Sequence, residues 1–110
     1  MGKIIVSENA LAKLAALTTM QCYGVVGLVP TGFRERFSSL LSKDKASRGI
    51  EVEIQGRHVS FTVYVVLQSG VKVSEVASTI IRQVSYKLKK FTGLKDIDVN
   101  VVIKSVRREN

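Results

Sequence analysis

The residues that could carry chemistry are few. The chain has one histidine, His58, and one cysteine, Cys22. A histidine can act as a general base and a cysteine as a nucleophile, but each needs a partner group within hydrogen-bond reach. His58 follows Gly56-Arg57 in a predicted hairpin turn, where we favour a solvated side chain over a catalytic one. The neighbours of Cys22 are uncharged, so we expect a small buried residue with an unreactive thiol.

The carboxylates and glycines give no stronger indication of catalysis. Glu51 and Glu53 lie on one face of a predicted strand, where a carboxylate pair is usually solvated. Thr92-Gly93-Leu94-Lys95 lacks the full spacing of a phosphate-binding loop. A single cysteine also excludes an internal disulfide and a CxxC metal site. We therefore predict no enzyme: no catalytic residues, no metal site, no cofactor and no small-molecule substrate.

Positive charge is the more prominent chemical feature. The 110 residues carry 17 Lys+Arg against 9 Asp+Glu, a formal net charge of +8. Nucleic acid, anionic lipid and acidic proteins are therefore electrostatically suitable partners. A candidate anion-binding patch lies on a predicted long helix and comprises Arg82, Lys87, Lys89 and Lys90. Single-strand binding also uses exposed aromatic residues, and few are predicted here, so a solvated basic surface is favoured over a binding site.

The strand and helix that position these groups lie between residues 59 and 91. Ser60–Gln68 alternates between apolar and polar residues, which predicts a strand with one core face. After Ser69-Gly70, apolar residues recur every three or four positions, which predicts a helix that folds back on the strand. The predicted inner stripe is Val73, Val76, Ala77, Ile80, Val84, Leu88 and Phe91. Gly93 is expected to end this helix.

Two further helices are predicted before the organising strand. Ser7 is expected to cap the first of them. Its inner stripe is Leu11, Leu14, Ala15 and Thr18, and Leu17 and Met20 extend the predicted buried surface to a second side. We favour a helix wedged between the sheet and the next loop over a subunit contact. Residues 33–41 predict a short amphipathic helix in an exposed connection.

Cys22–Leu28 contains two glycines with the spacing of a KH-domain loop, which clamps nucleic-acid phosphates. Val25 and Val26 stand between these glycines, and the segment holds no basic residue. We therefore favour a buried structural turn, with Gly24 as the C-cap of the first helix.

The order of elements predicts an α+β fold: a two-layer sandwich of a mostly antiparallel sheet of three main strands with two helices on one face. Ile50–Gln55 is expected to form a hairpin with the organising strand, with Ile54 facing inward, and Asp96–Lys104 is the third strand. Lys3–Val6 is a candidate short edge strand. The length suits a single domain over residues 1–110.

The uncharged stretch over residues 14–33 is long enough to span a membrane, but Pro30 and several glycines interrupt it. We therefore predict no transmembrane helix. Because the chain does not begin with a positively charged, apolar leader, we expect a cytoplasmic protein.

The outer face of the sheet holds a second candidate site. Tyr64, Val66 and Val102 are predicted to point away from the helices, within a rim of polar residues. An apolar and aromatic centre within a polar rim is typical of a protein interface. A lightly covered back of the sheet is an equally good interpretation.

Several segments, in this order and spacing, resemble the alkaline-shock-protein family of bacterial envelope-stress proteins, most closely its YloU-like branch. They are Gly2–Ser7, Cys22–Leu28, Arg48–Val52, Val63–Val66 with Gly70–Ala77, and Thr92–Leu94 with Val99–Val101. Two features depart from the family pattern: many relatives are acidic, and Ser74 stands where relatives often carry proline.

The resemblance implies a non-enzymatic cytoplasmic protein of cell-envelope homeostasis. In some members a separate anchor protein holds the domain at the membrane. We expect a protein-interaction or scaffolding module with protein partners or further copies of itself, and the alternative is a module that binds nucleic acid or anionic lipid.

Overall fold

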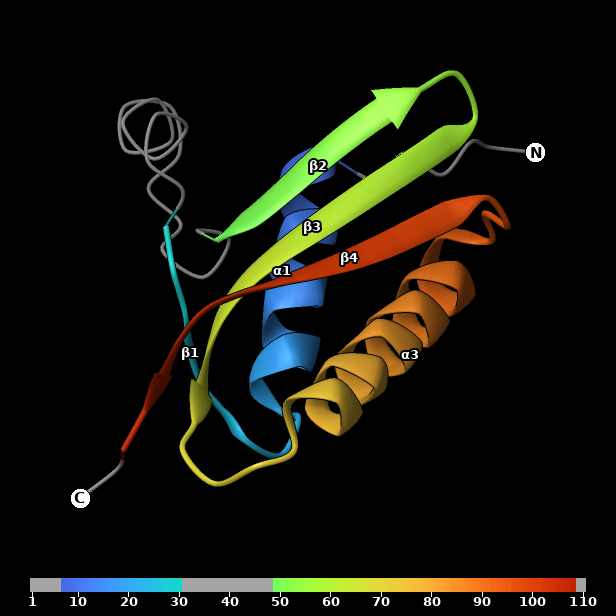
Figure 1. Cartoon of the computed structure of the whole chain (residues 1–110). Helices are drawn as coiled ribbons and strands as arrows, with labels where there is room; N and C mark the ends of the chain where they lie inside the picture. Colours follow the sequence, from blue (N-terminus) through green and yellow to red (C-terminus); the bar gives the residue numbers. More distant parts are fainter. Residues whose placement is uncertain (1–6, 31–48, 109–110) are drawn as a thin grey trace.

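The computed structural model describes residues 7–30 and 49–108. In chain order its elements are α1 (Glu8–Met20), β1 (Val25–Leu28), β2 (Ile50–Gln55), β3 (His58–Gln68), α3 (Val73–Thr92) and β4 (Ile97–Arg107). Figure 1 shows both labelled helices on the same face of the sheet. The predicted α+β two-layer sandwich is confirmed. The edge strand predicted at Lys3–Val6 and the helix predicted over residues 33–41 lie outside the described residues.

Strand β3 is the centre of the sheet. It pairs antiparallel with β2, from Ile50 opposite Val63 to Gln55 opposite His58, and antiparallel with β1. On its other edge it pairs parallel with β4, from Val59 opposite Ile97 onward. The parallel pair follows from α3, because a helical crossover returns the chain to the end of the sheet from which β3 started. The sheet is thus mostly antiparallel, as predicted, with one parallel edge strand.

The segment Cys22–Leu28 differs from the predicted turn. Helix α1 is capped at Gln21 rather than Gly24, and Val25–Leu28 forms strand β1. Gly24 makes the turn between them with φ 88°, and a Cβ there would lie 3.1 Å from Val76 Cγ2. The segment missed the sequence criteria for a strand because it is short and paired with a distant part of the chain.

Strands β1 and β2 lie end to end along one edge of β3, since β4 occupies the other edge over the same residues. Tyr64 joins them: Val29 N donates to its carbonyl oxygen at 2.9 Å, and its own N–H donates to Gly49 O at 2.9 Å. The chain therefore leaves this ladder after Val29 and returns to it at Gly49 without a break in the hydrogen bonding of β3.

The core lies between β3 and the helices. Phe61, Val63, Val65 and Leu67 are fully buried, together with Ile80, Val84 and Leu88 of α3 and Ala15 of α1. The predicted alternation of β3 is thus confirmed. So are three predicted end signals: Ser7 Oγ accepts from Ala10 N at 3.1 Å, Gly93 caps α3 with φ 77°, and Gly70 turns the chain with φ 93°.

Some predicted inward residues lie in solvent instead. Phe91 is 62% exposed although it continues the inner stripe of α3, because the buried part of that stripe ends at Leu88. Ile54 is exposed near the hairpin, beyond Val52. Leu17 and Met20 are also exposed, so the prediction that α1 buries a second side is wrong. Helix α1 packs on the sheet and on α3 through one broad face only.

Candidate functional site

Tyr64 lies on the outer face of the sheet, in register with Val102 of β4. Its phenol donates a hydrogen bond to Glu51 Oε1 at 2.5 Å. This bond, and to a lesser extent burial, raises the pKa of Tyr64 above its usual value, because both disfavour the phenolate. Since its backbone also joins β1 to β2, Tyr64 is a half-buried, fixed part of the outer face.

Val66 is only 6% exposed and lies outside the main core cluster. The register of β3 against β4 shifts between Val65 and Val66, so that Val66 pairs with Ser105. A partner protein cannot contact a valine that is buried to this extent. The predicted interface therefore retains Val102 and the exposed part of Tyr64, and its role in partner binding stays a prediction.

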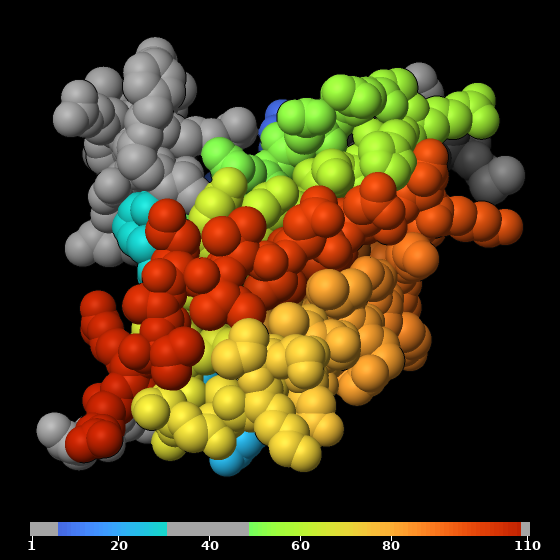
Figure 2. Space-filling model, in the orientation of Figure 1, coloured from blue at the N-terminus to red at the C-terminus, as the bar shows by residue number. Residues whose placement is uncertain are grey.

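The edge of β4 extends this candidate interface. The strand has 11 residues, and within residues 7–30 and 49–108 it pairs with β3 alone. Figure 2 shows β4 as an exposed band between β3 and α3. Val102 is 37% exposed on this strand. An edge strand presents unpaired backbone donors and acceptors, and these can bind another extended segment.

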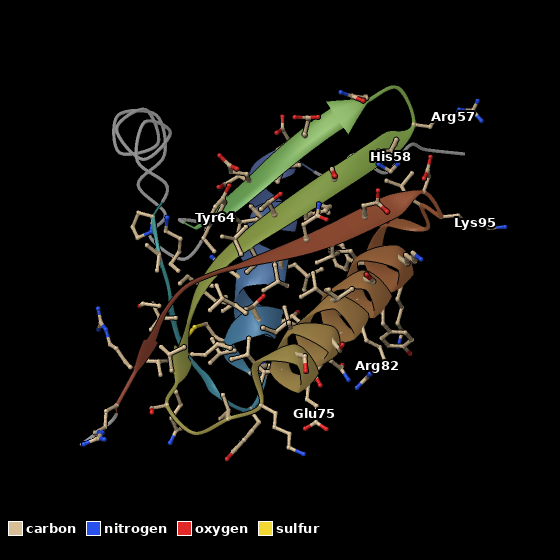
Figure 3. The ribbon with its side chains drawn as sticks, in the orientation of Figure 1. Arg57, His58, Tyr64, Glu75, Arg82 and Lys95 are labelled. Atoms are coloured by element: carbon tan, nitrogen blue, oxygen red, sulfur yellow. The ribbon has the colours of Figure 1, made fainter. Side chains whose placement is uncertain are left out.

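His58 is the largest departure from the predicted site chemistry. It is the first residue of β3 and half-buried, not a solvated turn residue. Its Nδ1 lies 2.8 Å from Asp96 Oδ1 and its Nε2 lies 3.1 Å from Asp98 Oδ2. Figure 3 shows it between the starts of β3 and β4. The hydrogen bond to Asp96 is the largest cause that raises the pKa of His58, and both carboxylates add to it.

This arrangement makes His58 a clamp between two strands. With both ring nitrogens bonded to carboxylates, the imidazolium form is favoured and no ring nitrogen is left to accept a substrate proton. Sequence reasoning missed the clamp because Asp96 and Asp98 become neighbours of His58 only through the parallel pairing of β3 with β4. The alternating acid positions at the start of a strand, Asp96 and Asp98, were the available signal.

Cys22 lies far from His58. Gly24 O accepts from Gln68 N at 2.7 Å, so the end of α1 adjoins the end of β3 opposite to His58. At about 3.3 Å per residue, the two ends of β3 are roughly 30 Å apart. Burial raises the pKa of the Cys22 thiol, whereas a nucleophile needs a lowered one. The structure therefore does not bring these two residues together.

The four cations of the predicted anion-binding patch are all exposed on α3. Arg82 points away from the sheet in Figure 3, while Lys87 lines a hollow of about 350 Å³ between α3 and the end of α1. Lys90 Nζ lies 5.7 Å from the centroid of the Tyr86 ring, a cation–π contact. The positions fit a basic helix surface, and anion binding there stays a prediction.

The described part of the chain contains neither a metal site nor a membrane-spanning helix. No group of three or more His, Cys, Asp or Glu residues within it could hold a metal ion. Among the helices described, none is sufficiently long and apolar to cross a membrane.

Solved structures with a similar fold include forms of MamM CTD. A single-substitution variant of MamM CTD has a TM-score of 0.52 at 13% identity, and the match covers 91% of this chain and 94% of that one. A cadmium form of a MamM CTD variant has a TM-score of 0.52 at 11% identity, with 94% and 100% covered. At such low identity these matches show a shared fold only.

Sequence relatives are more informative. The chain is 30% identical over 110 residues to the uncharacterized protein YloU of Bacillus subtilis strain 168, covering 99% of this chain and 92% of the relative. It is 31% identical over 107 residues to the uncharacterized protein Spy1614 of Streptococcus pyogenes serotype M6, covering 96% and 88%. A family model for alkaline shock proteins, described as having a cell envelope-related function, matches residues 1–108. The family expected from the sequence is confirmed, and this chain belongs to the alkaline-shock-protein family.

Proposed function

We propose that the protein is a non-enzymatic interaction module of the cell envelope, and that β4 binds an extended segment of an envelope-associated partner protein. The family has a cell envelope-related function. The protein would work in the cytoplasm and reach the membrane through such a partner, which includes the case of an anchor protein.

The state of the chemical groups supports binding rather than catalysis. Both ring nitrogens of His58 are bonded to carboxylates. The Cys22 thiol donates to Thr18 O at 3.5 Å, and its pKa is raised by burial. These groups lie at opposite ends of β3, so they do not form the converging nucleophile and base that covalent catalysis requires.

The observation that carries the proposal is the free edge of β4 beside the Tyr64–Val102 pair. A segment that adds to this edge would exchange backbone hydrogen bonds with β4, while Val102 would supply an apolar contact. Tyr64 would contribute little loss of side-chain entropy on binding, because Glu51 already fixes its phenol. Strand addition therefore suits the geometry of this side of the sheet.

Site-specific photo-crosslinking inside the bacterium tests the proposal. A photoreactive amino acid replaces Val102, and the matched control places it at Ile81 of α3, since these side chains are 37% and 39% exposed. We expect a discrete crosslinked partner from position 102 and none from position 81. Equal products from both positions, or none from position 102, would contradict the proposal. A product of twice the mass of the chain would instead identify a second copy as the occupant.

A further inference from the structure

The C-terminal half of α3 combines positive charge with exposed apolar groups. From Val76 to Lys95 the chain holds no acidic residue. The outer side of this region, which we call the α3-end surface, comprises Tyr86, Lys87, Lys90, Phe91, Leu94 and Lys95, and all six are exposed or partly exposed. Three of these six side chains are cationic and three are aromatic or aliphatic.

The apolar members of this surface stand in water without an evident role in folding. Phe91 is 62% exposed and Tyr86 is 57% exposed. Each lies four residues from a lysine, Phe91 from Lys87 and Tyr86 from Lys90, so cations and rings share one side of the helix. Lys90 Nζ sits 5.7 Å from the Tyr86 ring centroid. The two kinds of group therefore form one mixed surface.

Carboxylates close to this end of the molecule are turned to the sheet. Asp96 follows Lys95 directly, but its Oδ1 lies 2.8 Å from His58 Nδ1. Asp98 contacts the other ring nitrogen of His58 at 3.1 Å. Figure 3 shows Lys95 projecting outward, away from His58. Both carboxylates thus face an imidazole on the sheet, and the α3-end surface keeps its positive potential.

We propose that the α3-end surface docks on an anionic lipid bilayer. Lysines at a membrane surface are attracted by anionic headgroups, while aromatic and aliphatic side chains enter the boundary between headgroups and acyl chains. The three cations of this surface are lysines, which bind as point charges and lack the planar fork with which arginine recognises bases and phosphates. Leu94 has no ring on which a base could stack. A bilayer therefore fits this surface better than nucleic acid does.

This docking mode is independent of partner binding at β4. The α3-end surface belongs to the helix layer, whereas Tyr64 and Val102 face outward from the sheet layer. A bilayer on the helix side would leave the outer sheet face open to a protein partner.

Vesicle flotation tests the electrostatic part of the proposal. At about 0.1 M salt, the wild type should float with phosphatidylcholine vesicles that contain about one-third phosphatidylglycerol, and not with pure phosphatidylcholine. The double variant Lys87→Gln/Lys90→Gln should bind about 25-fold more weakly, because each lysine near an anionic surface contributes about fivefold. The matched control, Lys104→Gln/Arg107→Gln on β4, loses the same charge and should bind within about threefold of wild type.

A tryptophan reporter tests the apolar part, since the chain has no tryptophan of its own. The emission of Phe91→Trp should shift to shorter wavelength when anionic vesicles are added, whereas Val102→Trp, on the sheet layer, should not shift. Several results would overturn the proposal: no flotation, equal flotation with neutral vesicles, equal losses in the two charge variants, or an unshifted Phe91→Trp. Binding of a single-stranded oligonucleotide at the same salt without vesicle binding would assign the surface to nucleic acid instead.

Discussion

Replacing Gly49 by alanine should destabilise the protein through a clash at the place where the chain rejoins the ladder of β3. Gly49 has φ 87°, and a Cβ there would lie 2.9 Å from Val29 O and 3.1 Å from Val29 N. Both contacts are backbone atoms, and Val29 N is held by its 2.9 Å hydrogen bond to Tyr64 O. The added methyl group can be accommodated only if this junction moves.

The cost has two parts. A left-handed backbone costs an alanine about 1–2 kcal/mol relative to glycine. Displacing Val29 weakens a ladder hydrogen bond, which contributes about 1 kcal/mol net. We therefore expect Gly49→Ala to lower the free energy of unfolding by roughly 2–3 kcal/mol, out of the roughly 5–15 kcal/mol that is usual for a domain.

Gly70→Ala is the matched control. Gly70 has φ 93°, close to that of Gly49, but a Cβ there meets nothing within 4 Å. It should therefore cost only the backbone part, about 1–2 kcal/mol. Thermal unfolding followed by far-UV circular dichroism should place the Tm of Gly49→Ala about 4–8 °C below that of Gly70→Ala. Equal Tm values for the two variants would refute the tight junction between Val29 and Gly49.

Two more predictions concern the His58 clamp and the end of the helix stripe. The pKa of His58 is raised above its unfolded value of about 6.5, so its clamp should stabilise the fold fully below that pH and lose this effect as pH rises through the folded pKa. Urea unfolding of wild type and His58→Gln should thus differ most near pH 5 and converge at high pH, whereas a difference that grows with pH would contradict the clamp. Leu88→Ala should cost about 2–5 kcal/mol, because Leu88 is fully buried, while Phe91→Ala should cost under about 1 kcal/mol. Similar losses for the two variants in urea unfolding would show that Phe91 belongs to the core.

Local features of the chain were the most predictable from sequence. The alternation of β3, the period of α3 and the turns at Gly70 and Gly93 all depend on residues within one element or its ends. Their outcomes follow from backbone geometry and from the burial of one face. Sequence reasoning could therefore place the β3–α3 unit without knowledge of the rest of the chain.

Features that depend on distant pairing were not predictable in this way. Strand β1 exists because Val25 pairs with Leu67, and its own short sequence does not distinguish a strand from a turn. The His58 clamp requires β4 to be parallel to β3, which depends on the path of the crossover. The burial of Val66 likewise coincides with a register shift against β4. A period-two pattern predicts which face a side chain occupies, but not whether that face is covered.

The β3–α3–β4 crossover explains why the two proposed surfaces can act together. Because α3 returns the chain to the start of β3, β4 must run parallel to β3 and become the edge strand on that side. The same path places the lysine-rich end of α3 next to the start of β4, where Asp96 and Asp98 occur. By engaging these two carboxylates, His58 holds negative charge on the sheet side and leaves the helix side positive. One connection thus supplies a free strand edge on one layer and a basic, partly apolar surface on the other, which suits a protein that meets a bilayer and a partner at the same time.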